Sequence, residues 1–298
     1  MFISFSKQSE RIVRQMDRRC VRLMKTIGLL AFAVMFVLAG CAPAESGTGP
    51  KVSTQSNEDP SLVRKKAFAL VDWKRLDLQE VKVSRSQRFG SVYPAVLGTF
   101  VSEEDLALFE EAFRSAEKIE GVLDVAMPEY DLTFSSKDGE TGFHLWLGQS
   151  PGRKGLYTYV EDTGTGYTIS EEYADRLRQL IRSIRYGPEQ AISNGDIVNL
   201  HGELSNLQKW TQFVDQVRQG NRGEAHLTTY TIEGDPIFQD LLFDGEVIQF
   251  AFDNTMDGFG TPTRSNAFCK NLEEDDQVFT LSKCDREGPA FYFSARPQ

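Results

Sequence analysis

The spacing of hydrophobic residues changes along the 298 residues of the chain, and each change predicts a different kind of segment. Near the start, a continuous apolar run from Ile27 to Val37 follows Lys25, the order that a secretory signal requires. The run is about half of the ~20 residues that a membrane-spanning helix needs, which favours a leader over a permanent span. Residues 42–61 contain almost no apolar side chain, and this composition predicts a flexible tether. We therefore expect folding to begin near Leu62.

From residue 62 to residue 187 the pattern changes between strand and helix periods, which predicts a first module. Ser102 and Ser170 are each followed by acidic residues and then by apolar positions three and four apart, so each is expected to cap a helix. Strands are expected at 81–84, 131–134, 142–147, 156–160 and 167–169, with turns at Asp138-Gly139 and at Gly164/Gly166. This order favours an antiparallel sheet with helices packed on one face.

A second module is predicted over residues 190–298. A strand is expected at 196–204, and Ser205 or Asn206 then opens a helix with one apolar face that includes Trp210 and Phe213. Further strands are expected at 226–232, 237–243, 247–252, 277–281 and 291–293, with a tight turn at Asp244-Gly245. The fold class expected for the whole is α+β, in two modules that are each an antiparallel sheet with helices on one face.

The end of the leader indicates how the chain is attached to a membrane. Leu38-Ala39-Gly40-Cys41 resembles the bacterial lipobox, and this resemblance implies that the Cys41 sulfur receives a diacylglycerol and that residues 1–40 are removed. The implied location is the outer face of the cell membrane. The basic stretch before Lys25 is longer than export requires, so Met24 is an alternative start and would give a leader of ordinary length.

Composition limits the partners of the mature chain. Without residues 1–40 the chain has 258 residues, with 26 Lys and Arg against 41 Asp and Glu, a net charge of −15. Such a chain is repelled by phosphate backbones and by anionic lipid surfaces. We therefore expect no nucleic-acid partner, and we expect contact with the membrane to run through the lipid anchor, which buried methylenes stabilise by about 0.8 kcal/mol each.

The number and positions of the cysteines are those expected of an exported protein. Cys20 lies in the leader and Cys41 is the lipidation site, so Cys269 and Cys284 remain. An even pair in an oxidising compartment favours a disulfide, and two separate buried thiols are the alternative. Neither Cys has a second ligand at metal spacing, which disfavours zinc.

Short motifs that imitate catalytic or metal sites lack an essential part. Gly148-Gln149-Ser150-Pro151-Gly152 matches a nucleophile elbow, but Pro151 has no N–H to serve as an oxyanion donor. The segment from Asp253 imitates a calcium loop, but Arg264 stands where that loop needs a bidentate Glu. The three His residues show no metal-ligand or Cys-His spacing. The sequence therefore predicts no cofactor and no metal.

One acidic cluster remains as a candidate site. Glu233-Gly234-Asp235-Pro236 is expected to bend the chain between two strands and to project two carboxylates, which is an arrangement able to transfer protons. Asp253 and Asp257 are the other members of this candidate. The simpler interpretation is a turn that links two strands.

The residues also resemble two known families. Residues 81–184, with Glu129-Tyr130-Asp131-Leu132 and His144-Leu145-Trp146-Leu147-Gly148, resemble the YhfM-like domain of bacillus-type lipoproteins. The segments at 195–198, 206–207, 233–237 and 253–260 resemble a lipoprotein domain of unknown function. The resemblance implies an exported, lipid-anchored, two-module protein, and it implies no activity, ligand or catalytic residue.

The function expected from the sequence is that of a lipid-anchored extracytoplasmic protein that binds a ligand or an envelope protein, or serves as envelope scaffolding. The alternative is an extracytoplasmic hydrolase or cation-dependent enzyme that uses the acidic residues of the second module.

Overall fold

The structure is a computed structural model that describes residues 71–73, 76–286 and 291–296. The leader, the lipidation site Cys41 and the tether at 41–61 lie outside these residues. All the described residues belong to one compact unit. Among them, no helix is long and apolar enough to cross a membrane.

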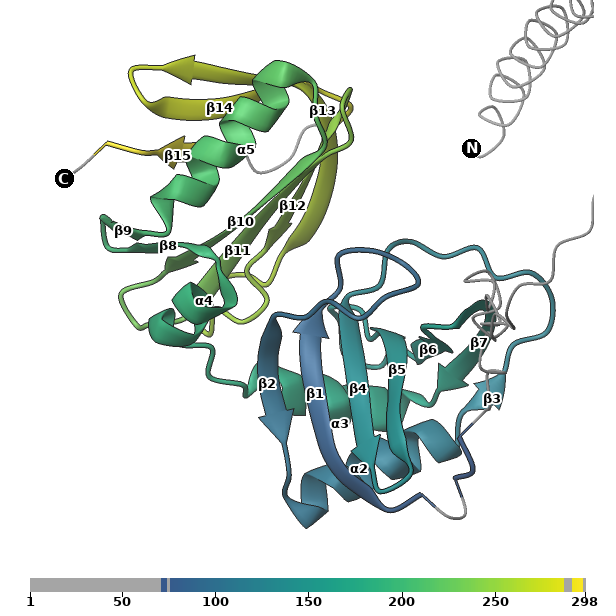
Figure 1. The fold of residues 1–298 in the computed structure, drawn as a ribbon. Coiled ribbons are helices and arrows are strands. Elements are labelled where there is room, and N and C mark those ends of the chain that lie inside the picture. The colour runs from purple at the N-terminus through teal and green to yellow at the C-terminus, as the bar shows by residue number, and fades with distance from the viewer. Residues whose placement is uncertain (1–70, 74–75, 287–290, 297–298) are drawn as a thin grey trace, which may run out of the picture. The chain divides into compact units, whose positions relative to one another are not determined.

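The first module is a seven-stranded antiparallel sheet, sheet A (Figure 1). Neighbouring strands of the meander from β4 to β7 are consecutive in the chain, while β1 lies between β2 and β4. In sheet order, the strands are β2 (Val96–Phe100), β1 (Leu78–Arg85), β4 (Tyr130–Ser136), β5 (Gly139–Trp146), β6 (Gly155–Tyr159), β7 (Asp162–Ile169) and β3 (Glu117–Lys118).

Two helices, α2 (Glu103–Arg114) and α3 (Glu171–Arg182), cover one face of sheet A (Figure 1). The hydroxyls of Ser102 and Ser170 accept the backbone N–H groups of Asp105 and Tyr173, so both predicted caps are confirmed. Acidic residues fill the first turn of each helix and an arginine stands in the last turn, as the helix dipole favours. The core between sheet and helices is rich in aromatic side chains, among them Phe109, Phe113, Phe134, Phe143 and Tyr157.

The second module is an eight-stranded sheet, sheet B (Figure 1). All its strand pairs are antiparallel except β8 with β10, which are parallel. In sheet order, the strands are β15 (Tyr292–Ser294), β14 (Val278–Cys284), β13 (Arg264–Asp275), β12 (Ile248–Asp253), β11 (Pro236–Phe243), β10 (Gly223–Tyr230), β8 (Ile197–Leu200) and β9 (Glu203–Ser205).

Helix α5 (Leu207–Gln219) lies along one face of sheet B, and the short helix α4 (Pro188–Asn194) precedes β8 (Figure 1). Trp210 and Phe213 of α5 are buried against Leu241, Ile248 and Phe250. The opposite face of sheet B contributes Tyr230 and Phe238 to the apolar core of the first module. The two modules are therefore α+β, as predicted, and they share packed apolar residues.

Two local predictions were wrong, and one long strand was missed. The turn between β6 and β7 falls at Val160-Glu161, so Gly164 and Gly166 lie inside β7. Residues 196–204 form a tight hairpin of β8 and β9 in place of one strand, because His201 and Gly202 adopt positive φ values of 53° and 102° and reverse the chain. The segment from Arg264 to Asp275, for which the sequence predicted no strand, is the long strand β13.

Cys269 and Cys284 form the predicted disulfide, and the alternative of two separate thiols is wrong. They stand opposite each other in the pairing of β13 with β14. The acidic run that follows Leu272 reaches the end of this hairpin, where Asp276 and Gln277 make the turn with positive φ values.

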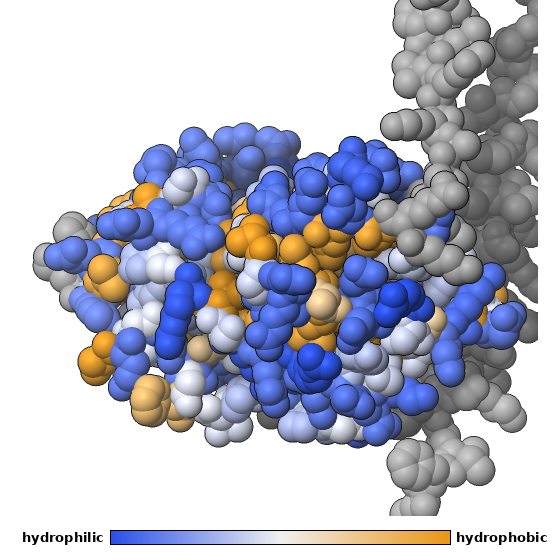
Figure 2. All heavy atoms as spheres, turned by 90° about the horizontal axis from the view of Figure 1, so that it is seen from below, coloured by the Kyte–Doolittle hydropathy of each residue, from blue (hydrophilic) through white to orange (hydrophobic). Residues whose placement is uncertain are grey.

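Most apolar side chains are buried, and the exposed ones are scattered over several elements. The face seen in Figure 2 is largely hydrophilic, with a band of hydrophobic atoms near its middle. Single exposed apolar residues of this kind are ordinary for a folded protein.

Candidate functional site

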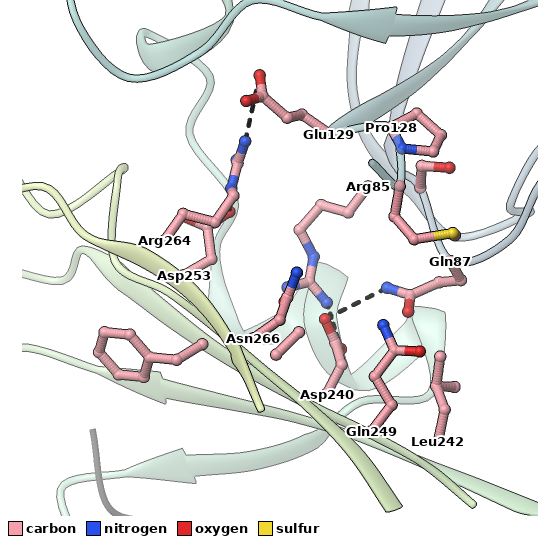
Figure 3. A pocket seen from close by; sticks show the side chains of 14 residues that line it. Arg85, Gln87, Pro128, Glu129, Asp240, Leu242, Gln249, Asp253, Arg264 and Asn266 are labelled. Carbon is pink, nitrogen blue, oxygen red and sulfur yellow. Dashed lines mark hydrogen bonds and ion pairs between the residues drawn. The ribbon is translucent and has the colours of Figure 1, made fainter. Parts of the chain in front are cut away.

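A polar cavity of about 80 Å³ lies between the first module and the face of sheet B that α5 does not cover. Figure 3 shows its side chains from close by. The first module contributes Arg85, at the end of β1, and residues from the segments at 86–87 and 127–129. Sheet B contributes alternate residues of three neighbouring strands, which are Asp240, Leu242, Gln249, Ala251, Asp253, Arg264 and Asn266.

The alternation of side chains in sheet B explains why this face is polar. In β11, Leu241 and Phe243 point into the core below α5, and Asp240 therefore points to the other face. In β12, Ile248 and Phe250 are buried in that core, so Gln249 and Ala251 point to the cavity. The polar residues thus meet because the strands are in register.

Asp240 is the centre of a buried network of charges. Its Oδ1 accepts from Nη2 of Arg85 at 2.7 Å and lies 2.8 Å from Nδ1 of His226, and its Oδ2 accepts from Nε2 of Gln87 at 3.3 Å. The Arg85 guanidinium also lies 3.9 Å from the centre of the Phe238 ring, a cation–π contact.

The ionisation of this network follows from its contacts. Burial raises the pKa of Asp240, but the charge of Arg85 and the hydrogen bond from His226 outweigh burial and hold the pKa well below its usual range. Burial lowers the pKa of His226, but the hydrogen bond with Asp240 and the nearby carboxylate of Glu224 raise it to about 9. Asp240 is therefore an anion between two cations at neutral pH.

A second charged group closes the other side of the cavity. Arg264 lies 2.6 Å from Oδ2 of Asp253 and 3.3 Å from Oε2 of Glu129. Glu129 also accepts the backbone N–H groups of Leu147 and Gly148. Burial raises the pKa of Asp253, but Arg264 and two hydrogen bonds from Thr255 lower it below the usual value.

Three side chains keep unused hydrogen-bonding groups at the cavity. Among the described residues, the amides of Gln249 and Asn266 have no hydrogen-bond partner, and Arg85 uses only Nη2. Figure 3 shows the amides of Gln249 and Asn266 pointing from sheet B toward Arg85 and Gln87. Buried or half-buried polar groups are normally hydrogen-bonded. The convergence of unused N–H groups from Arg85, Gln249 and Asn266 therefore marks a place for a ligand.

An open groove of about 950 Å³ adjoins the cavity, since Gln87, Leu242 and Gln249 line both. Four glutamine amides and five charged side chains line it, and Phe268 exposes 44% of its surface there. The groove is also lined by Arg88, Lys209, Gln212, Gln216, Arg222, Glu224 and Asp244.

The segment at 86–94, here called the strap, lies between β1 and β2 of the first module and contacts both modules beside this groove. Gln87 contacts Asp240, Arg88 pairs with Glu224 at 3.3 Å, and the Tyr93 ring lies 5.2 Å from the His226 ring. On the first module, the Gly90 and Tyr93 N–H groups donate to His144 and Asp131. The strap thus holds one wall of the groove in place.

The predicted acidic site is divided between two places. Glu233 and Asp235 line a separate pocket of about 280 Å³ together with Arg182 and Arg185, and Arg185 lies 3.7 Å from Asp235. Asp235 accepts the Gly258 N–H, and Asp257 accepts the N–H groups of Phe259 and Gly260 within the same loop. Asp253 lies at the polar cavity, bound to Arg264.

No group of three or more His, Cys, Asp or Glu side chains in the described part of the chain is arranged to hold a metal ion. The catalytic role of the acidic residues stays a prediction.

Sequence reasoning missed most of the cavity. Arg85 and Asp240 are 155 residues apart, and no local pattern links them. The alternation of polar and apolar residues from Gln249 to Asp253 was the available signal, because it places polar side chains on the face of β12 away from the core.

Fold and site define a two-module α+β protein with a polar cavity and groove where the strap meets sheet B. Residues 93–186 match the family model of the YhfM protein, and residues 194–280 match that of a domain of unknown function, DUF4362. The two matches confirm the resemblance seen in the sequence.

No curated protein matches the chain. Among solved structures, a thioesterase-like protein from Clostridium sporogenes is similar to 37% of this chain and to 98% of its own. The identity is 18% and the TM-score is 0.32.

Proposed function

We propose that the mature chain is a lipid-anchored binding protein on the outer face of the cell membrane. In this proposal, Cys41 holds the chain to the membrane and residues 42–61 act as the tether. The groove with its adjoining cavity binds a polar ligand. The observation that carries the binding part is the convergence of unpaired hydrogen-bonding groups from Arg85, Gln249 and Asn266 at the cavity.

The groove has the size and composition of a ligand site. Ligand pockets usually measure about 300–1,000 Å³ and orient their ligand with a few well-placed polar groups. The volume of about 950 Å³ lies in this range. The charged side chains of the cavity are already bound to one another, so its shape is largely fixed before a ligand arrives, which lowers the entropic cost of binding.

An enzyme is the second candidate. Glu233 and Asp235 line one pocket with two arginines, which supports a hydrolytic or cation-dependent reaction there. If this candidate is correct, Asp235→Asn abolishes turnover of a substrate found by screening, while binding in the groove is unaffected. Equal turnover by the wild type and by Asp235→Asn would exclude it.

Metabolic labelling with an alkyne analogue of palmitate tests the anchor. The wild-type chain is expected to incorporate the label and to fractionate with membranes, and Cys41→Ala is expected to do neither. Cys20→Ala is the matched control, because Cys20 lies in the leader. Labelling of Cys41→Ala at the wild-type level would refute the anchor.

Thermal unfolding of the full chain in mild detergent tests binding. The probes are acidic and neutral oligosaccharides, short acidic and basic peptides, and nucleotides, and a ligand is expected to raise Tm by mass action. Asn266→Ala is expected to remove the shift. Asn271→Ala is the control, because Asn271 stands in the same strand and lines neither the cavity nor the groove. A panel in which no probe raises Tm, or a shift that Asn266→Ala retains, would refute the proposed groove.

A further inference from the structure

The unused hydrogen-bonding capacity of the cavity is mainly that of donors. Both carboxylate oxygens of Asp240, Asp253 and Glu129 already accept hydrogen bonds or ion pairs from the protein. Arg85 keeps the N–H groups on Nε and Nη1, which donate to no described residue. The amides of Gln249 and Asn266 each add two N–H donors and one acceptor. A ligand group that fills the cavity must therefore bring acceptor oxygens.

Charge allows those oxygens to be ionised. Around the cavity, Arg85, Arg264 and the His226 imidazolium offset Asp240, Asp253 and Glu129. Along the groove, Arg88, Lys209 and Arg222 exceed Glu224 and Asp244 by one positive charge. The site is thus neutral to slightly positive in a chain whose mature part has a net charge of −15. A carboxylate that accepts from a free N–H of Arg85 forms a charge-assisted hydrogen bond, which is roughly twice as strong as a neutral one.

The volume of the cavity limits what enters it. At about 80 Å³, the cavity is much smaller than the groove of about 950 Å³. A small planar group such as a carboxylate suits the smaller space. The remainder of the ligand must lie in the groove.

The groove favours hydroxyl groups and a flat apolar face. Gln212 and Gln216 of α5 and Gln87 and Gln249 near the cavity line it, and each amide can both donate to and accept from neighbouring hydroxyls. Phe268 presents an exposed ring, on which the C–H face of a sugar can lie. Amides and one aromatic ring around an acid-binding cavity match a sugar acid, whose hydroxyls can pair with the amides and whose C–H face can lie on the ring.

We propose, on the basis of the proposed binding function, that the ligand is an acidic glycan whose sugar carboxylate enters the cavity beside Arg85. The sugar rings then lie along the groove between Phe268 and the glutamines of α5. Gln249 and Asn266 hold the carboxylate with Arg85, and they are specificity-determining residues for the acid.

The test uses isothermal titration of the full chain in mild detergent with four defined probes. These are trigalacturonate, its trimethyl ester, maltotriose and triglutamate. Trigalacturonate is expected to bind, and its trimethyl ester, which keeps the rings and loses the charge, is expected to bind at least tenfold more weakly. Maltotriose offers hydroxyls without acid, and triglutamate offers acid without hydroxyls, so both are expected to bind at least tenfold more weakly too.

Variants locate the binding. Asn266→Ala and Gln249→Ala are each expected to weaken trigalacturonate binding about tenfold and to leave binding of the trimethyl ester nearly unchanged. Asn271→Ala and Gln208→Ala are the controls, because neither residue lines the cavity or the groove. Since the amides of Gln249 and Asn266 have no hydrogen-bond partner among the described residues, their loss is expected to leave folding intact, which the melting curve verifies.

Four results would overturn the inference. If triglutamate binds as tightly as trigalacturonate and Asn266→Ala weakens both, the groove binds acidic peptides, and the proposed binding function stands while the glycan does not. If the trimethyl ester binds as tightly as the acid, the cavity does not hold a carboxylate. If none of the four probes binds but another member of the thermal panel does, the proposed ligand class is wrong. If no probe of any class binds, the proposed binding function is wrong as well.

Discussion

His226 makes the stability of the protein depend on pH in a defined direction. Its imidazole is buried, with Nδ1 2.8 Å from Asp240 and Nε2 3.8 Å from Glu224. These carboxylates raise the pKa to about 9 from an unfolded value near 6.5. Arg85 and the Tyr93 ring also face this group, but the carboxylates outweigh the repulsion by Arg85.

The sign follows from linkage. A group whose pKa is higher in the folded state stabilises that state fully below the unfolded pKa and loses this contribution as pH rises through the folded pKa. The difference of about 2.5 pKa units corresponds to about 3 kcal/mol at about 1.4 kcal/mol each. We therefore expect the free energy of unfolding to be about 3 kcal/mol lower at pH 9.5 than at pH 6.

Urea denaturation of the full chain at pH 6, 7.5 and 9.5 measures this change. His226→Gln is expected to be less stable at pH 6 and to lack the decrease. His201→Gln is the control, because His201 is exposed and contacts a backbone carbonyl. If the wild-type stability is constant over this range, or if His226→Gln shows the same decrease, the assignment of a charged imidazole beside Asp240 is wrong.

Three further predictions concern stability, each measured as a free energy of unfolding by chemical denaturation. The double variant Cys269→Ala, Cys284→Ala removes a crosslink with a sequence separation of 15. It is expected to lose about 3 kcal/mol of stability. Equal stability of the oxidised wild type and the variant would contradict this prediction. Trp210→Ala is expected to lose about 3–5 kcal/mol. Trp210 is 1% exposed and contacts Phe279, Phe291 and Phe293. A loss below 1 kcal/mol would show that this core is not packed as described. Ser102→Ala is expected to cost about 1 kcal/mol, because the Ser102 hydroxyl accepts from Asp105, while Ser102→Asp retains the cap and is expected to be near wild type.

The parts of the fold that the sequence predicted correctly are those with local causes. Helices α2 and α3 begin at a serine whose hydroxyl accepts a backbone N–H three residues on, and this cap is visible in four consecutive residues. The disulfide followed from counting cysteines after removal of the leader. In both cases the signal lies in a short segment or in the composition, and distant residues do not alter it.

The parts that were missed depend on distant residues. Strand β13 is polar along its second half and has no clear alternation there; it is a strand because β12 and β14 pair with its two sides. The cavity required knowing that Asp240 stands opposite His226 and that β1 ends beside both. Register between strands is fixed by the packing of the whole sheet, which a single sequence does not reveal.

Each sheet contains one His–Asp pair in directly opposed positions, Asp131 with His144 in sheet A and His226 with Asp240 in sheet B. Both use Nδ1 of the imidazole, at 2.7 Å and 2.8 Å. The strap determines how they differ. Nε2 of His144 accepts the Gly90 N–H, so the ring proton must lie on Nδ1 and be donated to Asp131.

The fully buried pair in sheet A therefore acts as an anchor for the strap, since Asp131 also accepts the Tyr93 N–H at 2.8 Å. The pair in sheet B has no such backbone donor, and its imidazole instead carries a charge that balances Asp240 together with Arg85. A change that loosens the strap at Gly90 or Tyr93 thus displaces a wall of the groove without altering Arg85, Gln249 or Asn266. This coupling explains why residues of the first module, far in sequence from sheet B, are needed to complete the site.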